Sequence, residues 1–210
     1  MIKPPLHADK PYDNQPPLLL LCGGQSRRMG SAKPLLTYDG QTLIERMTNN
    51  ALPHRPVWLA AAGAHYQTPN GVEYLLDALP NKQGPLPAIL PALKQAQTQG
   101  FAGVYVLACD TLLLPENVIA RLALGQSQSA WREGVVALGD EIQLHPLLAY
   151  WSSELTTSLE RYLAGGGRRV MHWLEHIPHH CISMPSHWSA LSNFNTPDAF
   201  KRAITTLRSL

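Results

Sequence analysis

Hydrophobic residues in this 210-residue chain fall into short, nearly continuous runs, and the segments between them have the spacing of amphipathic helices. The runs at 18–22, 57–62, 72–76 and 104–109 have the length and composition of strands buried on both faces of a parallel sheet. Because helical segments separate most of these runs, the pattern predicts an α/β fold, a three-layer and doubly wound, mostly parallel sheet.

Capping signals predict where several helices begin. Thr42 and Glu45 have the spacing of a capping box, and Thr196 followed by Pro197 has the order of an N-cap and a first helical residue. Gly84 and Pro85 precede another apolar helical pattern. Further helices are predicted after Pro115, over the leucine stripe at 155–163 and at 170–176.

The second half is less regular than the first. It predicts strands at 135–138, 147–151 and 181–184. The proline-rich segment 1–16 lacks apolar periodicity, so we expect a flexible N-terminal tail followed by a single domain over 17–210.

Composition and charge exclude several functional classes. A net charge of +2 is too small to indicate a nucleic-acid-binding surface. No apolar run approaches the ~20 residues that a membrane span requires, and the N-terminus lacks the order of a signal peptide. The 3 cysteines form neither a disulfide framework nor a CxxC metal site, so we expect a cytoplasmic protein.

Glycines and cations follow the first predicted strand. Gly23 and Gly24 let backbone N–H groups approach an anion or a ring edge, and Arg27, Arg28 and Lys33 come shortly after. The spacing matches neither a Walker loop nor G-x-G-x-x-G. The pattern is typical of a phosphate-binding loop, and the simpler alternative is a tight turn with a solvated basic loop.

Asp110 follows the fourth predicted strand. In doubly wound sheets, ligands bind beyond the carboxyl ends of the strands, and Mg²⁺ takes one or two carboxylates together with substrate phosphates. Asp110 is therefore a candidate Mg²⁺ ligand, although an aspartate here could instead cap the next helix.

Polar groups in the C-terminal half offer further candidates. Asn193 and Asn195 are two apart, so both amides would point the same way on an extended segment. Arg168 follows three glycines and could bind a phosphate by charge-assisted hydrogen bonds. His172 and His176 have a spacing able to hold a metal, but with 9 histidines in the chain we favour a solvated helix face.

Two cysteines end predicted strands. Cys22 and Cys109 would lie on neighbouring strands in the common 3-2-1-4 order, at distances that permit a disulfide. Nearby cations would lower the pKa of a thiol. These features predict inactivation by mild oxidation and protection by bound nucleotide; the alternative is two small residues buried in the core.

The glycine loop resembles the nucleotidyltransferases, and most closely the molybdenum cofactor guanylyltransferases, whose loop reads roughly L-A-G-G-x-S-x-R-M-G-x-D-K. This chain matches at Leu21, Gly23, Gly24, Ser26, Arg28, Met29, Gly30 and Lys33. It departs from the family at Cys22 and Ala32. The likeness continues through Cys109-Asp110 to the terminal N-x-N-T-P, and so covers nearly the whole chain.

The resemblance implies transfer of GMP from GTP to the terminal phosphate of molybdopterin, with or without bound molybdenum, and release of pyrophosphate. Arg28 and Lys33 would neutralise the triphosphate, and Asp110 would bind Mg²⁺. Leu21, Cys22, Gly23, Gly24 and Asp77 would contact the nucleotide; Asn193, Asn195 and Arg168 would contact molybdopterin. Cofactor-delivery or acceptor proteins would be partners.

Two alternatives remain open. A related transferase would use CTP or a sugar phosphate, although the glycine pair favours guanine. A nucleotide-binding relative without turnover would fit the departures at Pro87 and at Ala60, Ala61 and Ala62, where the family often has N-A-N.

Overall fold

The computed structural model describes residues 15–23, 29, 32–80, 83–125 and 133–210. Its strands are β1 (Leu18–Leu21), β2 (Thr37–Tyr38), β3 (Gln41–Thr42), β4 (Val57–Ala60), β5 (Val72–Leu75), β6 (Gly103–Ala108), β7 (Val135–Gly139), β8 (Leu144–Ser152) and β9 (His179–Ser183). Its α-helices are α1 (Leu43–Ala51), α2 (Leu86–Gln99), α3 (Pro115–Gly125), α4 (Thr156–Ala164), α5 (Val170–Leu174), α6 (Trp188–Leu191) and α7 (Pro197–Arg208); 3₁₀ turns η1 (Lys33–Leu35) and η3 (Ser153–Leu155) complete the order.

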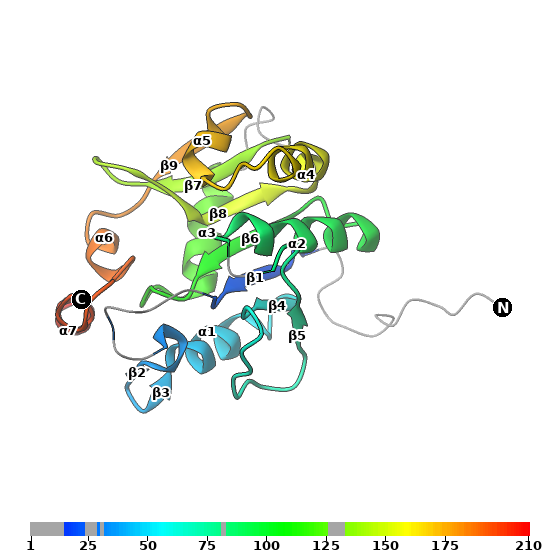
Figure 1. Cartoon of the computed structure of the whole chain (residues 1–210). Helices are drawn as coiled ribbons and strands as arrows, with labels where there is room; N and C mark the ends of the chain where they lie inside the picture. The colour runs from blue at the N-terminus through cyan, green and yellow to red at the C-terminus, as the bar shows by residue number, and fades with distance from the viewer. Residues whose placement is uncertain (1–14, 24–28, 30–31, 81–82, 126–132) are drawn as a thin grey trace.

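A seven-stranded sheet in the order β5-β4-β1-β6-β8-β7-β9 forms the middle layer (Figure 1). β1 pairs in parallel with β4 on one side and with β6 on the other, which confirms the predicted order of the first four strands of this sheet. β8 runs antiparallel to both β6 and β7, and β9 is parallel to β7. The sheet is therefore mostly parallel, as predicted.

Helices cover both faces of the sheet. Leu18 and Leu20 of β1 belong to the same buried cluster as residues of α1, α3 and α7, whereas Leu19 and Leu21 pack with α2, α4 and α5. All four leucines are at most 7% exposed, as expected for a strand that alternates its side chains between two covered faces. This arrangement is the three-layer α/β architecture that the hydrophobic pattern predicts.

The predicted elements lie within a few residues of the observed ones. The capping box is present, because the Thr42 side chain accepts from the Glu45 N–H and Glu45 accepts in turn from the Thr42 N–H. The hairpin of β2 and β3 and the short helix α6 were not predicted. The strand predicted at 147–151 begins earlier, at Leu144, so that Pro146 lies inside β8.

None of the helices in the described part of the chain is both long and apolar enough to cross a membrane.

Candidate nucleotide site at the carboxyl edge of the sheet

The ends of β1 and β6 lie side by side at one edge of the sheet. Leu21 is paired with Ala108, and the Cys109 N–H donates to the Leu21 carbonyl at 3.1 Å. Gly23 and Asp110, the residues just beyond, therefore lie at the same edge. After β1, the chain adds β4 and β5 on one side of β1 and then crosses over to add β6 on the other side. The edge beside β1 and β6 is therefore the switch point at which doubly wound sheets bind ligands.

Lys33 joins two predicted site residues that are far away in sequence. Its Nζ lies 2.9 Å from Asp110 Oδ2 and 2.6 Å from Asn195 Oδ1. The side chains of Lys33 and Asp110 are 15% and 21% exposed, so the ion pair is partly shielded from water but open to a ligand. The structure thus brings one cation, one carboxylate and one amide together at the carboxyl edge.

The segment that carries the asparagines is tied to the end of β6. Thr111 forms an isolated bridge with Ser192, and the Phe194 N–H donates to the Asp110 carbonyl at 3.4 Å. Phe194 is 2% exposed and packs on Phe200 of α7, with ring centroids 4.9 Å apart. This buried aromatic residue leaves the amides on either side of it exposed.

The expectation of an extended segment at Asn193 is wrong. Asn193 has a φ of 55°, in the left-handed region that asparagine tolerates better than most residues. The two amides nevertheless meet, because Asn195 Nδ2 donates to Asn193 Oδ1 at 3.2 Å. The left-handed backbone at Asn193, rather than an extended strand, therefore brings the two amides together.

Gly23 lies against the segment that departs from the family pattern. A Cβ placed on Gly23 would lie 3.1 Å from the Ala62 Cβ, which is closer than almost all real contacts of this kind. Ala62 itself has a φ of 49°, and Cys22 is held by a hydrogen bond from its N–H to the Ala60 carbonyl at 2.8 Å. The absence of a Cβ at Gly23 thus lets the backbone at this position lie close to Ala62 without a steric clash. Gly24 and Arg28 lie outside the described residues.

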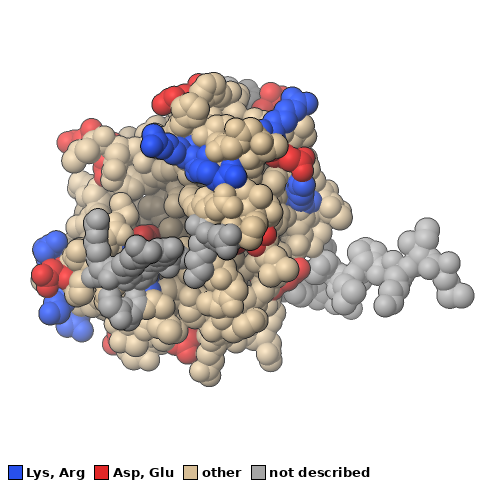
Figure 2. Space-filling view, viewed as in Figure 1, with Lys and Arg blue, Asp and Glu red and all other residues tan. Residues whose placement is uncertain are grey.

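A hollow of about 190 Å³ lies next to the ion pair. Asp110, Thr111, Ser192 and Asn193 line it from one side, and the start of β8 lines it from the other. Figure 2 shows this face of the molecule, which is hollowed near its centre, with basic side chains above the hollow in the region of α5. The hollow is large enough for part of a small-molecule substrate.

His145, which the sequence analysis did not select, lines this hollow and forms part of a polar group with Asp140 and Ser189. His145 Nε2 lies 3.0 Å from Asp140 Oδ2, and the Ser189 hydroxyl donates to the same oxygen at 3.0 Å. The hydrogen bond with His145, together with those from the Ile142 and Gln143 N–H groups, holds the pKa of Asp140 well below its usual value. Asp140 accepts hydrogen bonds from the N–H groups of the residues that follow it, as aspartates in turns do. In the sequence, the pair Gly139-Asp140 was the signal that could have marked this turn.

Arg168 and Asp77 lie farther from the ion pair. The Arg168 guanidinium donates to Gln83 Oε1 at 2.7 Å and to the Leu163 and Gly167 carbonyls, so it caps the end of α4. Asp77 is half-buried beyond the end of β5, two strands from β1, and the adjacent Ala78 N–H donates to the Pro87 carbonyl at 2.8 Å.

The two central cysteines are neighbours, as predicted, but the expected lowering of a thiol pKa is wrong for Cys22. Both are free and buried, and their thiols are hydrogen-bonded to each other. Burial, reinforced by Cys109, raises the pKa of the Cys22 thiol well above its ordinary value. Cys22 is therefore held as a neutral thiol rather than as a thiolate.

The fold and the edge site together define a doubly wound α/β protein in which a lysine and an aspartate lie beyond the ends of the central strands β1 and β6. Residues 18–179 match the family described as MobA-like NTP transferase domain. The chain belongs to this family.

Individual relatives agree with this assignment. The chain is 30% identical over 186 residues to a molybdenum cofactor guanylyltransferase of Pasteurella multocida, covering 87% of this chain and 91% of that one. It is 29% identical over 189 residues to the enzyme of the same name from Haemophilus influenzae, covering 89% and 96%. The solved structure of molybdopterin-guanine dinucleotide biosynthesis protein A from Archaeoglobus fulgidus has the same fold, with a TM-score of 0.71, 22% identity, and coverage of 92% and 100%.

Proposed function

We propose that this protein transfers GMP from GTP to the terminal phosphate of molybdopterin, with or without bound molybdenum. The relatives that share most of its length are named for guanylyl transfer to this cofactor. The observation that carries the proposal is the Lys33–Asp110 pair at the switch point, because a triphosphate bound there would need both a cation and a metal-binding carboxylate.

An oxygen of the acceptor phosphate attacks the α-phosphorus of GTP, the bond to the β-phosphate oxygen breaks, and pyrophosphate leaves. An anionic phosphate needs no general base, so the protein acts by positioning and by neutralising charge. Lys33 and Arg28 serve the triphosphate and the leaving group. The backbone from Leu21 through Cys22, Gly23 and Gly24 faces the guanine, and Asp77 lies on the nucleoside side.

Asp110 suits Mg²⁺, which prefers carboxylate oxygens and keeps places for water and phosphate. Its carboxylate follows a buried strand, is partly exposed, and lines the hollow. Magnesium bound there supplies positive charge to the phosphates. Lys33 Nζ donates to Asp110 Oδ2 in this structure, and from this position its ammonium group can reach a phosphate when a nucleotide binds.

The acceptor belongs on the side of Asn193 and Asn195. Asn195 also contacts Lys33, so the acceptor side and the triphosphate side meet at one lysine. His145 borders the same hollow, with its ring held by Asp140. Arg168 is the weaker candidate here, because its guanidinium already makes three hydrogen bonds to protein groups. We further propose that proteins that deliver or accept the cofactor are partners of this chain, and that it acts in the cytoplasm.

The assay that tests this function measures pyrophosphate release with molybdopterin and Mg²⁺, with GTP, CTP and ATP supplied in turn, and a parallel series replaces molybdopterin with a sugar phosphate. We expect release with GTP that requires molybdopterin. Preference for CTP, or turnover only with a sugar phosphate, would assign the protein to a related transferase. Binding of nucleotide without release in any combination would favour a relative that has lost turnover, which the alanines at 60–62 suggest.

A further inference from the structure

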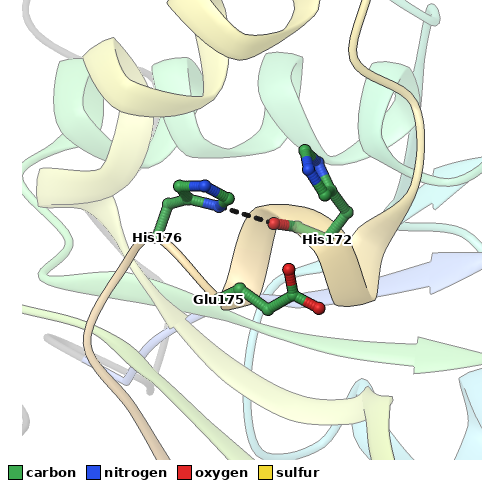
Figure 3. Close-up of side chains that lie close together, drawn as sticks. All are labelled: His172, Glu175 and His176. Atoms are coloured by element: carbon green, nitrogen blue, oxygen red, sulfur yellow. Dashed lines mark hydrogen bonds between the residues drawn. The ribbon is translucent and has the colours of Figure 1, made fainter.

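A second group of ligand-type side chains lies away from the nucleotide site. Among the residues that the structure describes, His172, Glu175 and His176 each offer one metal-ligand atom, and these atoms all lie within 4.8 Å of one another (Figure 3). All three side chains are exposed. Helical hydrogen bonds continue past α5, from the Glu175 N–H to the Met171 carbonyl and from the His176 N–H to the Trp173 carbonyl, so the three share one face of the turn.

Hydrogen bonds settle which nitrogen of His176 can bind a metal. Its Nδ1 lies 2.7 Å from the His172 carbonyl oxygen. A carbonyl oxygen only accepts, so Nδ1 carries the proton and the neutral ring has its lone pair on Nε2. A ring whose other N–H is held by a carbonyl is typical of histidines that ligate metals.

His172 Nδ1 contacts the side chain of Tyr162. The Tyr162 hydroxyl donates to the Arg169 carbonyl at 3.1 Å, and His172 Nδ1 lies 3.0 Å from the hydroxyl oxygen. With the hydroxyl proton directed at this carbonyl, Nδ1 of His172 would be the donor to Tyr162. That tautomer leaves the lone pair of His172 on Nε2, the nitrogen that a metal would use.

The opposite face of this turn is firmly packed. Trp173 and Leu174 are 2% and 1% exposed, and Trp173 stacks on Trp151 of β8 with ring centroids 5.4 Å apart. A zinc ion with tetrahedral ligands at about 2.1 Å holds them roughly 3.4 Å apart. The ligand atoms now lie within 4.8 Å of one another, and we expect small rotations of these exposed side chains, within the two ring hydrogen bonds, to close the remaining distance.

We propose that His172, Glu175 and His176 form a binding site for Zn²⁺ or a similar divalent transition metal, with a fourth position open to solvent. Two imidazoles and one carboxylate match zinc, whereas Mg²⁺ prefers oxygen ligands and belongs at Asp110. His172 and His176 have the i, i+4 spacing of two zinc-binding histidines on one helix face, and Glu175 adds a carboxylate oxygen beside them. The sequence alone favoured a solvated face because it showed neither the approach of Glu175 nor the carbonyl contact that fixes the His176 tautomer.

The full chain, freed of metal and without nucleotide, is titrated with Zn²⁺ by calorimetry in excess Mg²⁺. We expect one Zn²⁺ per chain from this site. His172→Gln, Glu175→Gln and His176→Gln should each weaken binding about 10-fold or more, and Tyr162→Phe, which keeps all three ligands, about 10- to 100-fold. Zn²⁺ should also raise the melting temperature of the unmodified protein and leave that of His176→Gln unchanged.

His179→Gln is the matched control, because His179 is exposed and its Nδ1 also contacts a carbonyl, that of Ile177. It should bind Zn²⁺ as the unmodified protein does. The proposal is overturned if the unmodified protein binds no Zn²⁺, if any of the three ligand variants binds as well as it does, or if His179→Gln loses as much affinity as they do. Because no nucleotide is present, this result is independent of the proposed function.

Discussion

Lys33 Nζ lies 2.9 Å from Asp110 Oδ2, although 77 positions separate the two residues in the chain. The contact joins the loop after β1 to the end of β6, and the hydrogen bond from Lys33 to Asn195 extends it to the segment before α7. One lysine therefore links the three chain segments to which the proposed function assigns triphosphate, metal and acceptor.

Replacing this lysine should abolish most of the activity. Lys33→Ala removes the cation nearest the proposed triphosphate position, and we expect guanylyl transfer to fall by about 100-fold or more. Initial rates at saturating GTP and molybdopterin measure the effect. Lys201→Ala, which removes an exposed lysine of α7, is the control and should leave the rate unchanged. Equal rates in the two variants would remove Lys33 from the mechanism.

Asp110→Asn tests the magnesium ligand without changing side-chain volume. The rate should fall by about 100-fold or more, because the variant loses the charge that holds the metal while the buried strand before it is untouched. Circular dichroism would confirm that the fold is retained. Asp39→Asn, at an exposed turn whose φ of 52° suits asparagine, is the matched control. Near-normal activity of Asp110→Asn in saturating Mg²⁺ would exclude the metal-binding role.

The Asp140–His145 contact should appear in the pH dependence of stability. Because the folded pKa of Asp140 is lowered, its contribution is fully present above the unfolded value of 3.8 and is lost as the pH falls through the folded value. Urea unfolding from about pH 6 down to about pH 3 should therefore show a steeper loss for the unmodified protein than for Asp140→Asn. Parallel pH profiles would contradict the assignment.

Oxidation should spare the central cysteines. Burial raises the pKa of Cys22, so little thiolate forms near neutral pH, and we expect mild peroxide to modify exposed Cys181 first. Mass spectrometry of the treated protein measures the order, and Cys22→Ala should lose activity no more slowly than the unmodified protein. Early formation of a Cys22–Cys109 disulfide would contradict this prediction and would support the oxidation sensitivity expected from the sequence.

The sequence predicted the sheet well because its strands are buried on both faces. The strand Leu18–Leu21 can be predicted from its own residues, without knowledge of its neighbours in the sheet, because every position in it is apolar. The local patterns gave the site residues only as separate candidates, and the family resemblance alone assigned them to one site. Nothing near Lys33 in the sequence indicates Asn195, which is 162 positions away, and nothing near His145 indicates that it borders the same hollow as Asp110. Arg168 looked like a free cation because the carbonyls that it caps become neighbours only after α4 has formed.

The fate of the α-phosphorus of GTP tests the central claim most directly. The unmodified protein is incubated with molybdopterin, Mg²⁺ and GTP labelled at the α- or the γ-phosphorus, with Asp110→Asn alongside. We predict that the α-label enters a molybdopterin–guanine dinucleotide while the γ-label leaves as pyrophosphate, and that Asp110→Asn does neither at a comparable rate. The γ-label in the molybdopterin product, or no transfer of either label, would contradict guanylyl transfer at this site.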